Sequence, residues 1–118
     1  MSANLTQVSK FENLSQFSFS CDIPIPSYLI AIVIGDLKTK TLNDRISIIA
    51  EQSQLDSIGS NLNDLPSYLE QVEHFLTPYS WGSFNLLILP PNFPYGGMEN
   101  PLLTYAQPSI LSGNQNLV

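Results

Sequence analysis

The 118-residue sequence is poor in cysteine, histidine and cations, and each scarcity excludes a class of protein. Cys21 is the only cysteine, so no disulfide can form within the chain and nothing indicates an oxidising compartment. The only histidine, His74, lies far from Cys21 in the sequence, which argues against a cysteine nucleophile. Four Lys and Arg residues against ten Asp and Glu residues give a net charge of -6, which argues against a nucleic-acid partner.

Long apolar segments are also missing. The longest apolar run, residues 28–34, is far shorter than the roughly 20 residues that span a bilayer. The first ten residues are polar and lack the apolar stretch of a signal peptide. We therefore expect a cytoplasmic protein without a membrane partner.

Several segments have the pattern of β-strands. Phe17 and Phe19 alternate with polar residues, which predicts a half-buried strand over residues 16–20. Residues 28–34 form a short β-branched run bounded by proline and glycine, which predicts a strand buried on both faces. Further strands are expected over residues 45–50, 86–89 and 102–106.

One segment has the periodicity of an amphipathic helix. Its apolar residues fall on one helical face: Leu65, Tyr68, Leu69, Val72, Phe75 and Leu76. Asp64 is the expected N-cap, Ser67 and Glu70 have the spacing of a capping box, and Pro78 ends the helix. His74 lies beside the apolar face, and we interpret it as a boundary residue because no second histidine can share a metal.

The order of these elements predicts an α+β protein. Strand, helix and strand follow one another from Arg45, which is typical of an α/β unit, and a mostly β region precedes them. The polar stretch over residues 36–44 is the best candidate for a domain boundary. Residues 51–63 are polar and have no clear pattern.

The segment with the clearest chemical content is residues 90–101, Pro-Pro-Asn-Phe-Pro-Tyr-Gly-Gly-Met-Glu-Asn-Pro. Adjacent glycines such as Gly96 and Gly97 mostly mark a tight turn. Glu99 is the only carboxylate after His74, and by itself it is either a surface charge or a site charge. Physical reasoning alone favours the surface charge.

A family resemblance changes that interpretation. Gly-Met-Glu-Asn at residues 97–100, preceded by Gly96, resembles the Gly-x-Met-Glu-Asn exopeptidase signature of the aminopeptidase N clan. Residues 93–101 are more similar to its leukotriene A(4) hydrolase and aminopeptidase B subgroup, and the flanking segments over residues 24–31, 78–82 and 86–91 agree.

The resemblance implies how the chain is divided into domains and which part of the family's longer chain it corresponds to. Residues 1–37 are similar to the last strands of a saddle-like N-terminal β domain, and residues 38–44 correspond to a linker. Residues 45–118 are similar to the first part of a thermolysin-like catalytic domain. We therefore expect a fragment that ends before the zinc helix of this family.

The resemblance also implies a zinc metalloaminopeptidase, which removes N-terminal residues from peptides. Glu99 is then the expected catalytic residue, because the Glu of the signature binds the free N-terminal amine by a charge-assisted hydrogen bond. Tyr95, Gly96, Gly97 and Met98 are expected to bind the peptide with it, as an extended segment that pairs with the substrate. Tyr95 and Met98 are expected to line the pocket for the first side chain.

The chain lacks the zinc motif of that family. No His-Glu-x-x-His sequence occurs, so the zinc ligands are expected outside this chain and the chain alone is expected to be inactive. Two alternatives stay open: a non-catalytic remnant or peptide-binding fragment, and a part of a bifunctional epoxide hydrolase. Asn85, where relatives tend to carry Asp, departs from the family pattern.

Overall fold

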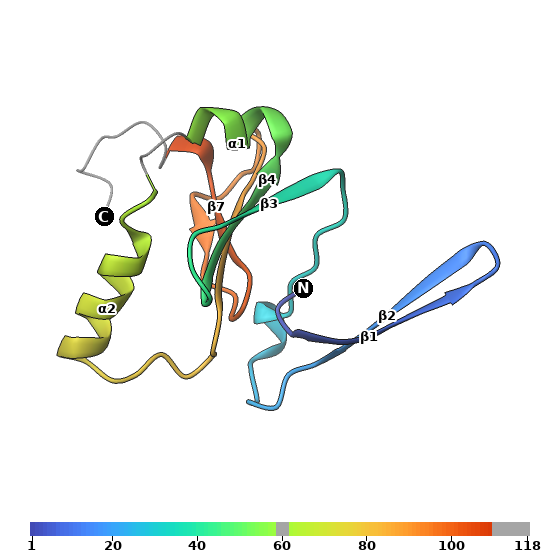
Figure 1. Ribbon diagram of the computed structural model, residues 1–118, viewed down its shortest axis with the longest axis horizontal. Coiled ribbons are helices and arrows are strands. Elements are labelled where there is room, and N and C mark those ends of the chain that lie inside the picture. Colours follow the sequence, from blue (N-terminus) through green and yellow to red (C-terminus); the bar gives the residue numbers. More distant parts are fainter. Residues whose placement is uncertain (59–61, 110–118) are drawn as a thin grey trace.

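The computed structural model of the protein describes residues 1–58 and 62–109. Its main body is a five-stranded sheet with three parallel central strands and an antiparallel strand at each edge (Figure 1). In spatial order the strands are β3 (Leu37–Thr41), β4 (Ile46–Glu51), β5 (Phe84–Ile88), β7 (Thr104–Ala106) and β6 (Gly97–Met98). Helices α1 (Gln52–Ile58) and α2 (Leu65–Phe75) connect β4 to β5, so the fold is mixed α+β and the predicted strand–helix–strand unit is confirmed.

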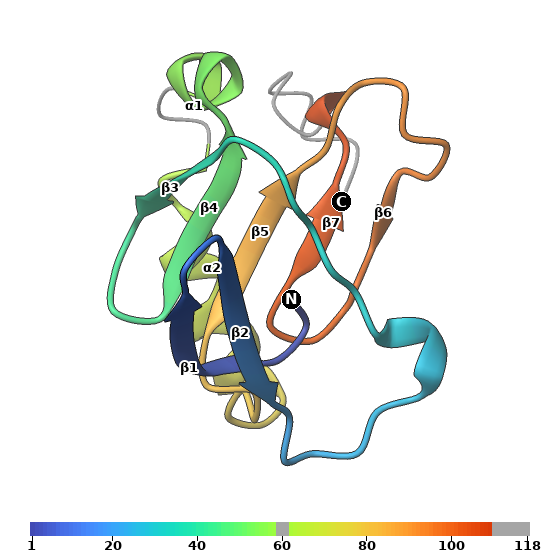
Figure 2. The ribbon, with the colours of Figure 1, turned by 90° about the vertical axis from the view of Figure 1, so that its right-hand side faces the viewer.

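Both faces of this sheet are covered, because side chains of successive strand residues point to opposite faces. The face toward the helices contains Ile48, Ala50, Leu86, Ile88 and Ala106, packed against Leu55, Leu62 and Leu65. The other face contains Leu87, Leu89 and Leu103, packed against Val33, Leu37 and Phe93. Figure 2 shows α2 behind the sheet and the chain that leads into β3 crossing in front of it. Burial on both faces explains why apolar residues follow one another directly in the central strands, as at Leu86, Leu87 and Ile88 of β5.

The prediction for residues 28–34 is wrong. Ser27–Leu29 form a 3-10 turn, and the following residues are not part of a strand. Ile32 and Ile34 are 63% and 90% exposed, whereas Ala31 is buried. The Ala31 carbonyl accepts a hydrogen bond from the backbone N–H of Ser2, and the Ala31 N–H donates to the Ser2 hydroxyl. A β-branched run favours an extended backbone, but it does not determine whether neighbouring strands cover both of its faces.

A two-stranded hairpin, β1 (Asn4–Phe11) and β2 (Leu14–Ser20), projects away from the sheet (Figure 1). The strand predicted over residues 16–20 is confirmed and is longer, whereas its partner β1 was not predicted. Its expected half-burial is wrong, because Phe17 is 57% exposed. Isolated two-stranded ribbons bury little surface, so the alternating pattern does not by itself produce a covered face.

The hairpin nevertheless has one apolar face. Phe19 is paired with Leu5, and Phe17 is paired with Val8. The register shifts between Leu5 and Gln7, and this irregularity keeps the apolar residues of β1 on the same face as the two phenylalanines. We call Leu5, Val8, Phe17 and Phe19 the hairpin apolar face, and all four side chains are exposed.

Helix α2 forms where predicted, but its apolar stripe is not a core face. Four of the stripe residues are exposed: Tyr68, Val72, Phe75 and Leu76. Asp64 occupies the N-cap position without a side-chain capping bond, and the predicted capping box is absent. Ser67 lies inside the helix, where its hydroxyl accepts a hydrogen bond from Gln71. Because the helix already begins at Leu65, Ser67 does not occupy the N-cap position that a capping box requires.

The predicted linker over residues 38–44 contains most of β3, which pairs with β4 from Leu37 to Thr41. This stretch is therefore part of the sheet and its turn. The division into domains at that point stays a prediction. No helix among residues 1–58 and 62–109 is both long and apolar enough to cross a membrane.

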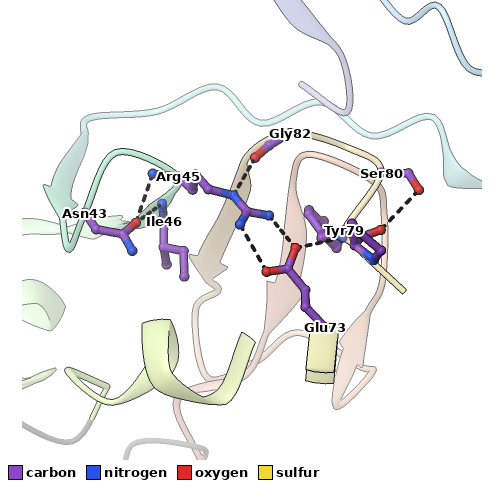
Figure 3. A network of polar contacts seen from close by, with 8 residues as sticks. Asn43, Arg45, Ile46, Glu73, Tyr79, Ser80 and Gly82 are labelled. Carbon is purple, nitrogen blue, oxygen red and sulfur yellow. Dashed lines mark hydrogen bonds and ion pairs between the residues drawn. The ribbon is translucent and has the colours of Figure 1, made fainter. Parts of the chain in front are cut away.

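A polar network fastens the end of α2 to the beginnings of β4 and β5 (Figure 3). The Arg45 guanidinium donates two hydrogen bonds to the Glu73 carboxylate, at 2.8 and 3.1 Å, and one to the carbonyl of Gly82 at 3.3 Å. The backbone N–H of Tyr79 also donates to Glu73, at 2.7 Å. The hydrogen bonds from Arg45 and then from Tyr79 lower the pKa of Glu73 from 4.5 to about 2. The network thus links the C-terminal part of α2 to the segment that leads into β5.

Candidate functional site at the sheet edge

The signature residues lie at one edge of the five-stranded sheet. β6 is the last strand in the spatial order, and it pairs with β7 through Gly97 opposite Ala106 and Met98 opposite Tyr105. Its other side faces no strand among the residues that the structure describes. Glu99 follows β6 directly, so the predicted anchor stands at the end of an edge strand that has room for one more strand.

The two glycines have different physical roles. A Cβ atom on Gly97 would lie 2.8 Å from the backbone oxygen of Tyr105, closer than real Cβ contacts allow. Gly97 is therefore required by the close approach of β6 to β7. A Cβ atom on Gly96 would meet nothing within 4 Å. Gly96 is therefore not required by packing against the described residues.

A buried turn follows Glu99 and returns the chain into β7. Asn100 is 2% exposed; its carbonyl accepts a hydrogen bond from the backbone N–H of Leu103 at 3.1 Å, and its amide donates to the Leu103 carbonyl. Leu102 has a φ of 64°, a left-handed conformation that costs energy for a leucine. Its carbonyl accepts a hydrogen bond from the side-chain amide of Asn85 at 2.9 Å. Burial and these amides hold the turn, so the position of Glu99 is constrained from its C-terminal side.

The loop before β6 is held by contacts that the sequence did not reveal. The backbone N–H of Gln107 donates to the carbonyl of Gly96 at 3.0 Å, and its side-chain amide donates to the carbonyl of Phe93. The Phe93 ring meets the rings of Tyr95 and Tyr105 edge to face. Burial raises the pKa of Tyr105, whose hydroxyl donates to the carbonyl of Ile32 at 3.0 Å. These contacts join residues far apart in the chain, and no local pattern indicates them.

The predicted site residues are open to solvent. Tyr95 is 66% exposed and Met98 is 36% exposed, and Glu99 is also exposed. Within the described part of the chain the Glu99 carboxylate forms no hydrogen bond and no ion pair. The predicted residues are consecutive: Tyr95 and Gly96 end the loop, Gly97 and Met98 form β6, and Glu99 follows it with an exposed carboxylate that is available to a cation.

The described residues do not fit a zinc site. In residues 1–58 and 62–109, no three His, Cys, Asp or Glu side chains come together in a way that could hold a metal ion. His74 lies exposed on α2 and contacts the ring of Phe75 at a centroid distance of 5.6 Å. No chemical step at this site can be assigned to a metal from these residues.

Two cavities lie away from the signature strand. One, of about 240 Å³, is lined by the C-terminal part of α2 and the segment from Leu76 to Trp81. The other, of about 210 Å³, is lined by the base of the hairpin, including Asn4 and Cys21, together with Trp81 and Leu102. The candidate site is thus a strand edge and not an enclosed pocket.

Comparison with known proteins identifies relatives of the chain. No protein-family model matches the chain. The chain is 42% identical over 105 residues to leukotriene A-4 hydrolase of Xenopus laevis, which covers 89% of this chain and 17% of the relative. It is 41% identical over 107 residues to leucine aminopeptidase 2 of Aspergillus clavatus, with 90% and 17% covered. The fold matches the solved leukotriene A4 hydrolase of Saccharomyces cerevisiae with a TM-score of 0.83 and 26% identity, over 99% of this chain and 18% of that chain.

These similarities define the chain as a mixed α+β segment that matches part of the Saccharomyces cerevisiae leukotriene A4 hydrolase structure. It belongs to the family of leukotriene A-4 hydrolases and leucine aminopeptidases 2, which confirms the predicted family. The chain spans 17% of the length of the curated relatives that it matches.

Proposed function

We propose that the chain is the part of a cytosolic zinc metalloaminopeptidase that receives the N-terminus of a peptide substrate. In this proposal residues 1–37 are the end of a saddle-like β domain, and residues from 45 onward begin a thermolysin-like catalytic domain. The zinc ligands lie outside this chain, and we assign no step to the metal. The proposal is supported by the exposed Glu99 carboxylate at the end of edge strand β6, which has no hydrogen-bond or ion-pair partner among residues 1–58 and 62–109.

The expected chemistry follows from the arrangement of that edge. The outer side of β6 offers backbone N–H and C=O groups, with which an extended peptide can pair. A peptide that pairs there brings its terminal ammonium group to the carboxylate that follows the strand. A charge-assisted hydrogen bond then fixes the amine, and the peptide bond next to it is presented in one place. Acetylation of the peptide removes the positive charge and therefore the recognition.

The test replaces the matched 107-residue segment of the Aspergillus clavatus leucine aminopeptidase 2 by this chain, which gives a complete enzyme. A charge-assisted hydrogen bond contributes roughly 1.5–3 kcal/mol, so Glu99→Gln is expected to lower kcat/KM by about 10- to 100-fold for a free peptide. The matched control is Glu70→Gln, which neutralises an exposed glutamate on α2.

The result is measured on a free peptide and on its N-acetylated form. We expect kcat/KM to be much higher for the free peptide than for the acetylated peptide in the parent enzyme. This difference is expected to be small in Glu99→Gln and as large as in the parent in Glu70→Gln. Equal activity of Glu99→Gln and the parent on the free peptide excludes Glu99 as the amine anchor.

A further inference from the structure

Gln107 holds the loop before β6 at two points. Its backbone N–H donates to the carbonyl of Gly96 at 3.0 Å, where the loop becomes the strand. Its half-buried side-chain amide donates to the carbonyl of Phe93, in the middle of the loop. A carbonyl can only accept, so the side-chain nitrogen of Gln107 must face Phe93. The side chain is therefore a donor in this contact, and a carboxylate or a thioether cannot replace it.

Phe93 transmits this restraint to an exposed site residue. Its half-buried ring packs against the apolar cluster of Leu87 and Leu103 on one face of the sheet. The same ring meets Tyr95 edge to face, with 5.8 Å between the ring centroids. Tyr95 itself is 66% exposed. Its ring direction therefore depends on where Phe93 is held.

We propose that Gln107 is a positioning residue that determines which first side chain of a peptide the site prefers. It acts through Phe93 on the ring of Tyr95, which is expected to form a wall of the pocket for that side chain. This inference rests on the proposed function, because it assigns a specificity role within the same site. It adds a residue that lies after β7 and outside the signature segment.

Loss of the side-chain bond alone leaves the strand edge intact. The bond from the Gln107 backbone to Gly96 is present in every variant, and the pairing of β6 with β7 does not involve the Gln107 side chain. Changes at Gln107 are therefore expected to move the loop around Phe93 and Tyr95 while the position of Glu99 stays the same. A positioning residue is expected to change the relative kcat/KM of two substrates. A residue that only supports the fold is expected to lower kcat/KM for both substrates equally.

The test compares Gln107→Met and Gln107→Glu in the complete enzyme described above. Both variants keep the length of the side chain and lose its donor, so an effect that they share comes from the lost hydrogen bond. The control is Gln71→Met, which removes a similar amide bond, 3.3 Å long, to Ser67 on the exposed surface of α2. For each enzyme kcat/KM is measured with two peptide amide substrates that differ only in the N-terminal residue, which is leucine in one and alanine in the other.

We expect the leucine-to-alanine ratio of kcat/KM to change by about threefold to tenfold in both Gln107 variants, the range for one lost hydrogen bond. The ratio is expected to stay within about twofold of the parent in Gln71→Met. A ratio within twofold of the parent in both Gln107 variants overturns the proposal, even where both activities fall together, because a uniform loss is a purely structural effect.

A second measurement separates this inference from the proposed function. Amide hydrogen exchange is followed in the 118-residue chain and in its Gln107→Met variant, without any substrate. Faster exchange of the Phe93 amide, which donates to the carbonyl of Pro90 at 3.1 Å, supports the positioning role if β4 and β5 are unchanged. If the parent complete enzyme has no aminopeptidase activity, the proposed function fails. Unchanged exchange at Phe93 overturns the role of Gln107 whether or not the proposed function holds.

Discussion

The five-stranded sheet and the N-terminal third of the chain are built from similar apolar sequences but have opposite exposure. Ile48 on β4 is 0% exposed, whereas Ile34 in the segment before β3 is 90% exposed. The hairpin apolar face and the isoleucines of residues 30–34 are as hydrophobic as the strands of the sheet. The difference shows that burial depends on the presence of a second layer and not on the pattern of one segment.

The exposed apolar surface of the N-terminal third also differs in kind from scattered surface residues. Exposed apolar residues recur along the hairpin, and from residue 28 to residue 34 every second residue is apolar and exposed. Contiguous apolar surface of this type usually marks a place where another layer packs. The contrast with the sheet can therefore be tested by measuring how much each region contributes to the free energy of unfolding.

The largest difference is expected between Ile48→Ala and Ile34→Ala. Truncation of a fully buried isoleucine removes its burial and leaves a cavity, so Ile48→Ala is expected to lower the free energy of unfolding by about 2–5 kcal/mol. Ile34→Ala is expected to change it by no more than about 0.5 kcal/mol. Urea unfolding of the three proteins, at a concentration where the chain is monomeric, gives both values. Equal losses in the two variants contradict the contrast between the regions.

A smaller difference is expected between the two glycines of the signature. Gly97→Ala places a Cβ atom against the Tyr105 backbone oxygen, so β6 must move and the free energy of unfolding is expected to fall by about 1–3 kcal/mol. Gly96→Ala meets open space, and a change of at most about 1 kcal/mol is expected. Thermal unfolding of both variants measures the difference. A larger loss for Gly96→Ala than for Gly97→Ala would mean that β6 is not held against β7 as described.

The smallest effect is expected from the acid titration of Glu73. Its pKa is lowered from 4.5 to about 2 in the folded protein, so the stability that it contributes is fully present above pH 4.5. That contribution is lost as the pH falls from 4.5 towards 2, because the unfolded state then takes up the proton first. We expect the difference in melting temperature between the parent and Glu73→Gln to shrink over this range. Glu70→Gln is the control, and a difference that does not vary with pH contradicts the role of the network.

Local sequence patterns predicted the three parallel central strands and the longer helix, but not β1, β3 or α1. The strands β4, β5 and β7 and the helix α2 were expected close to where they occur, because their apolar residues repeat with the period of a strand or a helix. The segment over residues 28–34 was misinterpreted, since the same β-branched composition fits an extended chain that is covered on one side. The two residues of β6 are too short to show any period.

The site shows a similar limit. Glu99 and its neighbours were found by family resemblance, because a four-residue signature can be read from adjacent positions. Gln107, Tyr105 and Asn85 act through contacts with residues more than ten positions away, and local periodicity does not contain such contacts. The role of Gly97 in the sheet was also hidden, because it depends on the distance to a strand that follows later in the chain.

The two edges of the sheet differ in their resistance to growth. Strand β3 carries Lys38 and Lys40 at alternate positions, and an incoming strand would have to remove water from their ammonium groups. Strand β6 consists of a glycine and a methionine and presents no such charge. An added strand is therefore expected to pair with β6 and not with β3. The β3 edge protects the protein from polymerisation through its sheet, while the β6 edge can still accept a single short chain.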